Sequence, residues 1–203
     1  MRNWAIIIYQ FRGEFVPEGG KHMNREDAFV LLQEHLKNKN LVKHCLSVEA
    51  CMRKFASHFG EDEDAWGIAG LLHDLDYEYT ADDPDNHALK TAEMLADKGL
   101  SDEIIHAIKA HNHKVEIENN MDAALLTSDP ATGFIIACAL MHPDKKLNSV
   151  DLKFMKKRFK EKSFAKGASR DQMRECVAMG IELDDFLTMC LEAMQGIDDQ
   201  LGL

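Results

Sequence analysis

Apolar side chains recur at three- and four-residue intervals along most of the chain. Between residues 41 and 59, for example, Cys45, Val48 and Met52 follow this spacing, which places them on one face of a helix. No strand–helix–strand rhythm, internal repeat or low-complexity tract interrupts the pattern. The sequence therefore predicts an all-α protein.

Capping and loop-forming residues mark where these helices begin and end. Asn24, Asp62 and Ser101 each precede a periodic apolar segment and are expected N-caps. The acidic stretch 75–86 and the Asn-rich stretch 112–121 are expected loops. These two loops are the expected mouth of any site between the helices, because loops commonly carry specificity.

Residues 122–142 are expected to form two helices that meet at Asp129. An aspartate is a common N-cap, and Pro130 would then occupy the favoured first position of the second helix. No segment of the chain is expected to approach the roughly 20 apolar residues needed to span a bilayer. The tail is expected to add helices over 151–162, 169–179 and 181–201.

Length and composition predict one domain with an appended N-terminal segment. At 203 residues the chain is long enough for a single well-buried core. Residues 1–23 are expected to be an appended segment of uncertain structure, with Met23 an alternative natural start. We expect residues 146–203 to pack as helices on the same domain as residues 24–145.

Charge and cysteine content narrow the functional classes. A formal net charge of −11 argues against a nucleic-acid polymer or an anionic membrane as partner, since both require basic surfaces. The five cysteines include no CxxC pair and read as reduced core thiols of a cytoplasmic protein. The basic run 153–162 is most simply a solvated helix face. Oligomeric state stays open.

Histidines and aspartates with metal-ligand chemistry lie beside several of the apolar stripes. Imidazole nitrogens and carboxylate oxygens are ligands for zinc, manganese and iron. Taken singly, each has an ordinary explanation: a core histidine, a surface histidine or a helix cap. His106 and His113 are weaker candidates. The residues selected are His44, His73, Asp74, His87, His111 and Asp129.

In this order and spacing, the six residues resemble the ligand set of the HD superfamily of metal-dependent phosphohydrolases, and specifically its small HDIG-type domain proteins. The blocks "GIAGLLHDLDYE", "HALKTAEML" and "SDPATGFIIACAL" carry the resemblance, which covers about residues 24–145. One departure is that the HDIG tetrad reads His-Asp-Leu-Asp at residues 73–76. The resemblance implies an HD-domain helical bundle with a metal site in its core.

The resemblance also implies how ligands are shared between ions. His44, His73, Asp74 and Asp129 would hold one ion, while His87 and His111 would complete a second site bridged by Asp74. The cofactor would be one or two divalent ions of Mn, Fe, Zn, Co, Ni or Mg.

The implied function is hydrolysis of a small phosphoester, such as a nucleotide, by metal-activated hydroxide. Asp74 would act at the reaction centre, with Asp76, Glu78 or Asn112 orienting the water and Lys90 approaching the substrate phosphate. Two alternatives remain open: a di-iron oxygenase of the HD type, and a non-catalytic helical module that binds a ligand and is stabilised by metal.

Overall fold

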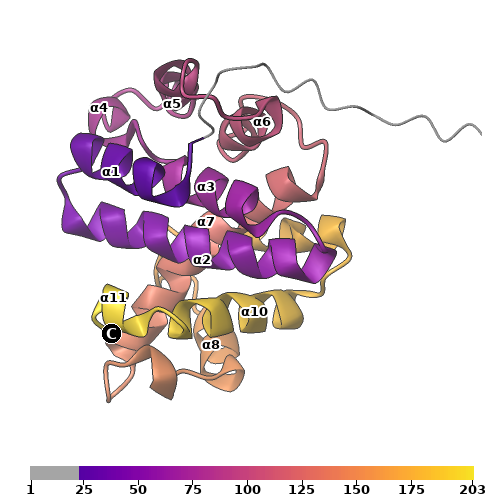
Figure 1. Cartoon of the computed structure of the whole chain (residues 1–203). Helices are drawn as coiled ribbons and strands as arrows, with labels where there is room; N and C mark the ends of the chain where they lie inside the picture. Colours follow the sequence, from indigo (N-terminus) through magenta and orange to yellow (C-terminus); the bar gives the residue numbers. More distant parts are fainter. Residues whose placement is uncertain (1–22) are drawn as a thin grey trace, which may run out of the picture.

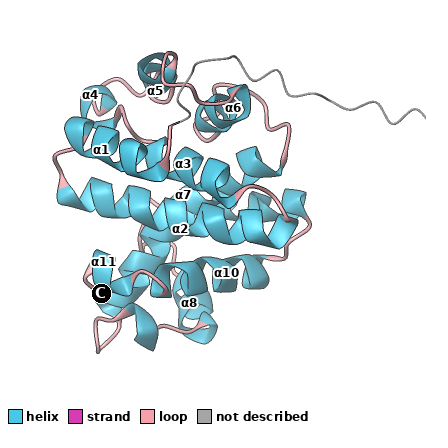
Figure 2. Ribbon diagram, viewed as in Figure 1, coloured by secondary structure: helices cyan, strands magenta, loops and turns pink. Residues whose placement is uncertain are grey.

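The computed structural model describes residues 23–203, so the expected appended segment falls almost entirely outside the described residues. Over residues 23–203 the chain forms helices and loops without a strand (Figure 2), which confirms the all-α prediction. The helices are α1 (Arg25–His35), α2 (Lys39–Phe59), α3 (Glu63–Leu72), α4 (Tyr77–Thr80), α5 (Leu89–Leu95), α6 (Asp102–Ala110), α7 (Asn120–Met141), η1 (Leu147–Ser149), α8 (Leu152–Phe159), α9 (Arg170–Arg174), η2 (Glu175–Met179), α10 (Leu183–Gln195) and α11 (Asp198–Leu201).

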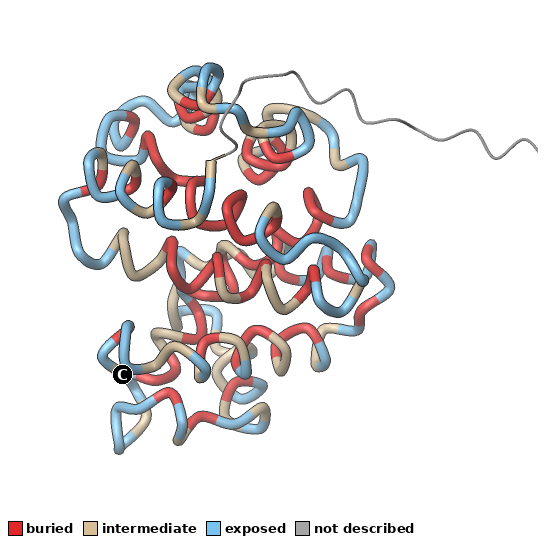
Figure 3. Tube along the Cα trace, viewed as in Figure 1, coloured by how far each residue is buried: buried red, intermediate tan, exposed pale blue. Residues whose placement is uncertain are grey.

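Helix α2 crosses the middle of the molecule and separates two groups of helices (Figure 1). Helices α1 and α3 lie along one side of it, with α4, α5 and α6 beyond them, while α10 packs on its other side. Helix α7 runs behind α2 and contacts both groups. Buried positions gather along α2, α3 and α7 (Figure 3), so the core lies where these three helices meet.

Close packing of α3 on α2 is permitted by a glycine. A Cβ placed at Gly70 would lie 2.8 Å from the Met52 Cγ atom and 3.0 Å from the backbone N and Cα of Glu49. These are shorter than van der Waals contacts, so any side chain at residue 70 would force the two helices apart. Gly70 lies three residues before His73 and therefore also sets where the end of α3 meets α2.

The predicted N-caps are confirmed. The Asn24 side chain accepts from the Asp27 N–H at 2.8 Å, and Asp62 accepts from Asp64 and Ala65 at 2.8 and 3.2 Å. Ser101 accepts from the Ile104 N–H. These bonds satisfy N–H groups that lack a partner inside the first helical turn.

The predicted break at Asp129 is wrong. Helix α7 is continuous from Asn120 to Met141, with Pro130 inside it. Proline removes one backbone hydrogen bond and disfavours a helical conformation in the residue before it. Most residues on both sides of Pro130 are buried, and this tertiary packing outweighs the local preference. Asp129 is consequently a mid-helix residue and not an N-cap.

Joining the two halves also corrects the expectation about apolar length. By length and composition, α7 alone among helices of the described chain could cross a membrane, but 67% of its apolar window is buried inside the molecule. Burial on nearly all sides explains why α7 lacks a polar face, as expected of a helix at the centre of a bundle.

The C-terminal helices pack against α7 and α2. Helix α9 and the 3-10 turn η2 contact α7, and α10 contacts both α7 and α2. The expected helix over 181–201 is divided at Gly196 into α10 and α11. All five cysteines are free and buried, in agreement with their prediction as core thiols.

Candidate metal centre

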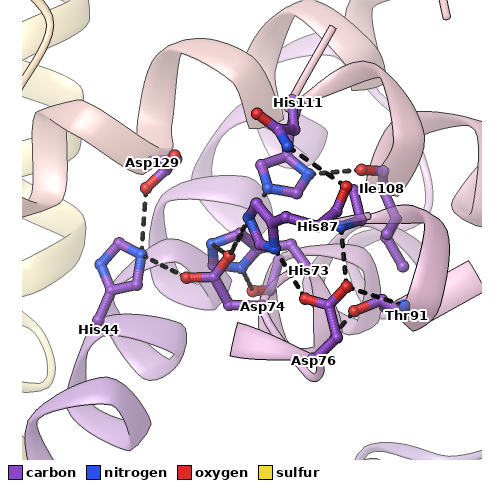
Figure 4. Close-up of polar contacts among 12 residues, drawn as sticks. His44, His73, Asp74, Asp76, His87, Thr91, Ile108, His111 and Asp129 are labelled. Atoms are coloured by element: carbon purple, nitrogen blue, oxygen red, sulfur yellow. Dashed lines mark hydrogen bonds and ion pairs between the residues drawn. The ribbon is translucent and has the colours of Figure 1, made fainter. Parts of the chain in front are cut away.

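The structure brings the six candidate ligands together at one end of the core (Figure 4). They come from five separate segments of the chain. His44 lies on α2 and Asp129 on α7, whereas the other four lie at or just beyond helix ends. His73 and His111 are the C-caps of α3 and α6, Asp74 follows in the turn after α3, and His87 precedes α5.

The end of α3 allows two adjacent residues to face the same point. On a continuing helix, His73 and Asp74 would diverge by roughly 100°. Helix α3 instead ends at Leu72 and the chain enters a tight turn, in which the Leu75 N–H donates to the Leu72 carbonyl. The His73 Nε2 atom then lies 3.4 Å from the Asp74 carboxylate.

Asp74 is the centre of the cluster, and its two carboxylate oxygens face different partners. Its Oδ1 atom lies 3.2 Å from the His87 Nε2 and 3.6 Å from the His111 Nε2. Its Oδ2 atom lies 3.6 Å from the His44 Nε2, which is also 3.1 Å from Asp129 Oδ1. Asp74 therefore lies between two groups of ligands.

Each histidine has its Nδ1 atom held by an acceptor, which fixes the tautomer. His73 Nδ1 donates to the Gly70 carbonyl at 2.8 Å, and His111 Nδ1 donates to the Ile108 carbonyl. His87 Nδ1 donates to the Asp76 carboxylate at 2.7 Å. A neutral imidazole that donates through Nδ1 carries a lone pair on Nε2, so these Nε2 atoms all face the cluster as acceptors.

His44 follows the same rule through a hydroxyl group. The Thr132 Oγ1 atom donates to the Asp129 carbonyl at 3.0 Å and therefore accepts from His44 Nδ1 at 3.1 Å. Thr132 is fully buried and was missed by sequence reasoning. The only signal for it is its position three residues after Asp129 on a helix.

These donor atoms fit a divalent metal. The Nε2 atoms of His73 and His111 are buried and have no hydrogen-bond partner among the described residues. A buried polar atom without a partner is costly, and imidazole lone pairs facing carboxylates repel unless a cation lies between them. Orientation of each ring through its second nitrogen is typical of metal-binding histidines.

Within residues 23–203, two overlapping groups of side chains could each hold a metal ion. In each group, the ligand atoms lie within 4.8 Å of one another. One contains His44, His73 and Asp129, and the other contains His73, Asp74 and His111. No cysteine belongs to either group. His87 lies outside both groups, but its Nε2 atom reaches Asp74.

Without metal, protons bound to the histidines compensate the negative charges of Asp74 and Asp129. Burial alone would lower the pKa of His73 and His87, but attraction to nearby carboxylates outweighs it and raises the pKa of His73 to about 8 and of His87 to about 10. Burial would raise the pKa of Asp74 and Asp129, yet the histidines hold both below their usual range.

The metal-free protein should therefore lose stability as the pH rises. A histidine pKa raised from 6.5 on folding stabilises the native state below pH 6.5, and this contribution is lost through pH 8 for His73 and through pH 10 for His87. Urea unfolding in a chelator at several pH values between 6.5 and 10 should show a falling midpoint. A midpoint that rises over this range would show that His73 and His87 are not protonated in the metal-free native state.

Asp76 does not face the cluster with a free oxygen. It is fully buried; Oδ1 accepts from His87, while Oδ2 accepts from the Ala88 and Thr91 N–H groups at 2.9 and 3.1 Å. Its own N–H donates to Thr91 Oγ1. These contacts place Asp76 behind the His87 ring, which it orients through Oδ1; the water-orienting role expected for Asp76 stays a prediction.

The other candidates lie at varying distances from the cluster. Glu78 accepts from the Lys37 and Asn38 N–H groups at 2.9 and 2.7 Å, which directs it to the α1–α2 turn. Lys90 is exposed and lies over the Tyr79 ring. Asn112 contacts His87, donating to its backbone carbonyl at 3.3 Å. Among these three, only Asn112 has a contact with a candidate ligand.

Asp76→Asn should weaken the half of the site that contains His87. The amide retains the shape of the carboxylate but removes the charge that orients the imidazole and raises its basicity. Loss of such a partner typically reduces metal affinity by about 10- to 100-fold. Metal titration should show one weakened site, whereas Glu78→Gln should leave metal affinity unchanged. If the affinity for both ions fell equally, His87 would not belong to one ion alone.

Comparison with known proteins identifies the family. The family model described as "HD domain" matches residues 41–156. The chain is similar to Ribonuclease Y of Oleidesulfovibrio alaskensis, with 30% identity over 96 residues that cover 47% of this chain and 18% of that protein. It is also similar to Ribonuclease Y of Rubrobacter xylanophilus (30% over 91 residues; 45% and 18%) and of Rhodopirellula baltica (24% over 146 residues; 72% and 26%).

The matched region is thus a small part of each of these longer relatives, between 18% and 26% of their length. No solved structure matches the chain. The family model, however, covers more than half of the 203 residues and includes all six candidate ligands. The chain belongs to the HD domain family.

Proposed function

We propose that the protein is a metal-dependent phosphohydrolase. The observation that carries this proposal is the convergence of four imidazole Nε2 atoms on the Asp74 and Asp129 carboxylates, with each Nδ1 atom held from behind. Divalent ions bound there would supply an activated water near neutral pH and would neutralise charge on a phosphoryl group.

The proposed site holds two ions that share Asp74. His44, His73 and Asp129 would hold one ion together with Asp74 Oδ2. His87 and His111 would hold the other with Asp74 Oδ1. For His44, His87 and His111 this division follows the two directions in which the Asp74 oxygens point. His73 lies 3.4 Å from Oδ1, and we assign it to the first ion because its ligand atom also lies within 4.8 Å of those of His44 and Asp129.

Exposure indicates the side from which substrate approaches. The His73 and His111 side chains are 0% and 2% exposed and that of His87 is 15% exposed, whereas those of His44 and Asp129 are 19% and 33% exposed. A phosphoryl group can therefore reach the cluster along the edge formed by α2 and α7. The buried histidines beneath it restrict access of bulk water to the inner part of the site.

The proposed substrate is a small phosphoester such as a nucleotide. A net charge of −11 disfavours long polyanions, although bound divalent ions would make the site itself locally positive. The similar proteins carry the name Ribonuclease Y, so an RNA phosphodiester is the principal competing substrate.

The test is turnover by the full chain after reconstitution with each of Mn, Fe, Zn, Co, Ni and Mg. Phosphate or nucleotide release would be measured with nucleoside monophosphates, a phosphodiester and an oligoribonucleotide. We expect metal-dependent hydrolysis of a monophosphate. Retained metal without hydrolysis of any substrate would contradict the proposal and favour a non-catalytic module, while oxygen consumption by an iron-loaded, coloured protein would favour an oxygenase.

A further inference from the structure

A groove begins at the exposed edge of the metal centre and leads away from it. One side is formed by His44 and by Asp129, Pro130, Gly133 and Ala137 of α7. The other side is formed by the loop 165–168, which lies between α8 and α9. Its volume of about 390 Å³ is in the range of small-molecule sites. The loop is also outside the residues matched by the family model.

The groove is open because its walls carry little side-chain bulk. A Cβ added at Gly133 or Gly167 would meet no atom within 4 Å. Ala137, Ala165 and Ala168 supply only methyl groups. Gly133 lies four residues after Asp129, so on a helix it faces the same direction and extends the groove directly from that ligand.

Lys166 supplies a positive charge in this groove. Apart from His44, it is the only basic side chain among the described residues that line it. Lys166 is exposed, and no ion pair or hydrogen bond of its ammonium group is found within residues 23–203. Its backbone neighbour Ala165 has a φ of 43°, a left-handed conformation that is unfavourable for a residue with a side chain.

The unusual loop conformation is held in place by Arg170. Its guanidinium donates to the carbonyls of Phe164 at 2.6 Å and of Ala165 and Ala168 at 2.8 Å. The same group lies 4.8 Å from the centre of the Phe134 ring on α7. Arg170 thereby fixes the loop to the helix that carries Asp129, so that the backbone of Lys166 keeps a defined position relative to the metal centre.

We infer that this groove binds the part of the substrate beyond the scissile phosphoryl group, and that Lys166 binds a second anionic group there. The inference rests on the proposed phosphohydrolase function. Its consequence is selectivity for a small substrate with two separated phosphates over one with a single phosphate. A lysine ammonium in a groove of small residues is suited to this role, because it is a flexible, strongly hydrated point charge.

Hydrolysis-resistant phosphonates test the inference by binding alone. Alkane-1,ω-bisphosphonates of three to six carbons and the matching alkylphosphonates would be titrated calorimetrically into the metal-loaded full chain. At one chain length the bisphosphonate should bind about tenfold more tightly, as expected of one charge-assisted contact. Lys166→Ala should abolish this advantage without changing the affinity for the monophosphonate.

Matched variants separate the groove from general effects. Lys162→Ala, which removes an exposed lysine outside the groove, should leave both affinities unchanged. Gly133→Phe should weaken the bisphosphonate, whereas Gly133→Ala should not, because a single methyl group fits there.

Two outcomes would overturn the inference, and they are distinguishable. If the bisphosphonate has no advantage at any length, or keeps it in Lys166→Ala, the second anion site is wrong while monophosphate hydrolysis still supports the proposed function. If the monophosphonate itself does not bind and no phosphoester is hydrolysed, both the inference and the proposed function fail.

Discussion

Asp74→Asn is expected to remove both bound metal ions and nearly all hydrolytic activity. Asp74 is the one residue with an oxygen facing each half of the cluster, at 3.6 Å from His44 and 3.2 Å from His87. An amide presents one oxygen and one NH₂ group, and the NH₂ cannot ligate a cation. Metal centres supply several kcal/mol of transition-state stabilisation, so turnover should fall at least about a thousandfold.

Metal analysis and phosphate release would be measured on Asp74→Asn together with circular dichroism to verify that the helices persist. Asp97→Asn is the matched control, because the Asp97 side chain is 84% exposed and pairs with Lys98 rather than with a candidate ligand. Unchanged metal stoichiometry in Asp74→Asn would show that this carboxylate is not a ligand.

Gly70→Val should produce the largest loss of stability among single glycine substitutions. Its Cβ would lie 2.8 Å from Met52 and 3.0 Å from the Glu49 backbone, and backbone cannot move aside as a side chain can. Overpacking of this kind typically costs about 1–3 kcal/mol, with valine at the upper end. Because the Gly70 carbonyl also orients His73, metal affinity should fall as well. Urea unfolding and metal titration would measure the two effects.

Two other glycines provide a graded control. The atoms nearest a Cβ at Gly67 would belong to the guanidinium of Arg53, the far end of a flexible side chain, and a Cβ at Gly133 would meet no atom within 4 Å. Gly67→Ala should therefore be mild. Gly133→Ala should be neutral or stabilising by up to about 1 kcal/mol, because alanine favours a helix. Equal losses at Gly70 and Gly133 would contradict close packing of α3 on α2.

The candidate ligands could be recognised from the sequence because chemistry and order along the chain were both informative. His73 and Asp74 stand at the end of an apolar run, and the predicted end of the helix there explained how adjacent residues could face one point. The structure places all six candidates together. Which atoms contact one another could not be predicted from the sequence, because it depends on how the helices pack. The family resemblance also led to the expectation that Asp74 bridges the two groups, and in the structure its two oxygens face different histidines.

The contacts of residues in the turns next to the ligands were harder to predict from the sequence. Asp76 and Glu78 are both acidic neighbours of the ligand pair, and no pattern distinguishes a buried carboxylate behind His87 from an exposed one at the α1–α2 turn. Likewise, Pro130 indicated a helix boundary, but burial on both sides kept α7 continuous. In each case tertiary contacts decided the outcome over local sequence.

Lys166 illustrates a further limit. It lies 37 residues after Asp129, in a segment without a recognisable motif. It lines the groove beside Asp129 on a loop that Arg170 joins to α7. The small residues of the run "FAKGAS" could have indicated an exposed turn, but not that this turn lies against α7. Lys90, selected from its spacing after His87, lies instead over Tyr79.

Metal content of the wild-type chain tests the central claim most directly. Protein purified without added metal, and again after reconstitution, would be analysed for metal by mass spectrometry alongside its visible spectrum. We expect about two divalent ions per chain, reduced to about one in His87→Ala. Absence of bound metal even after reconstitution would contradict a metal centre at these six residues and, with it, the proposed phosphohydrolase.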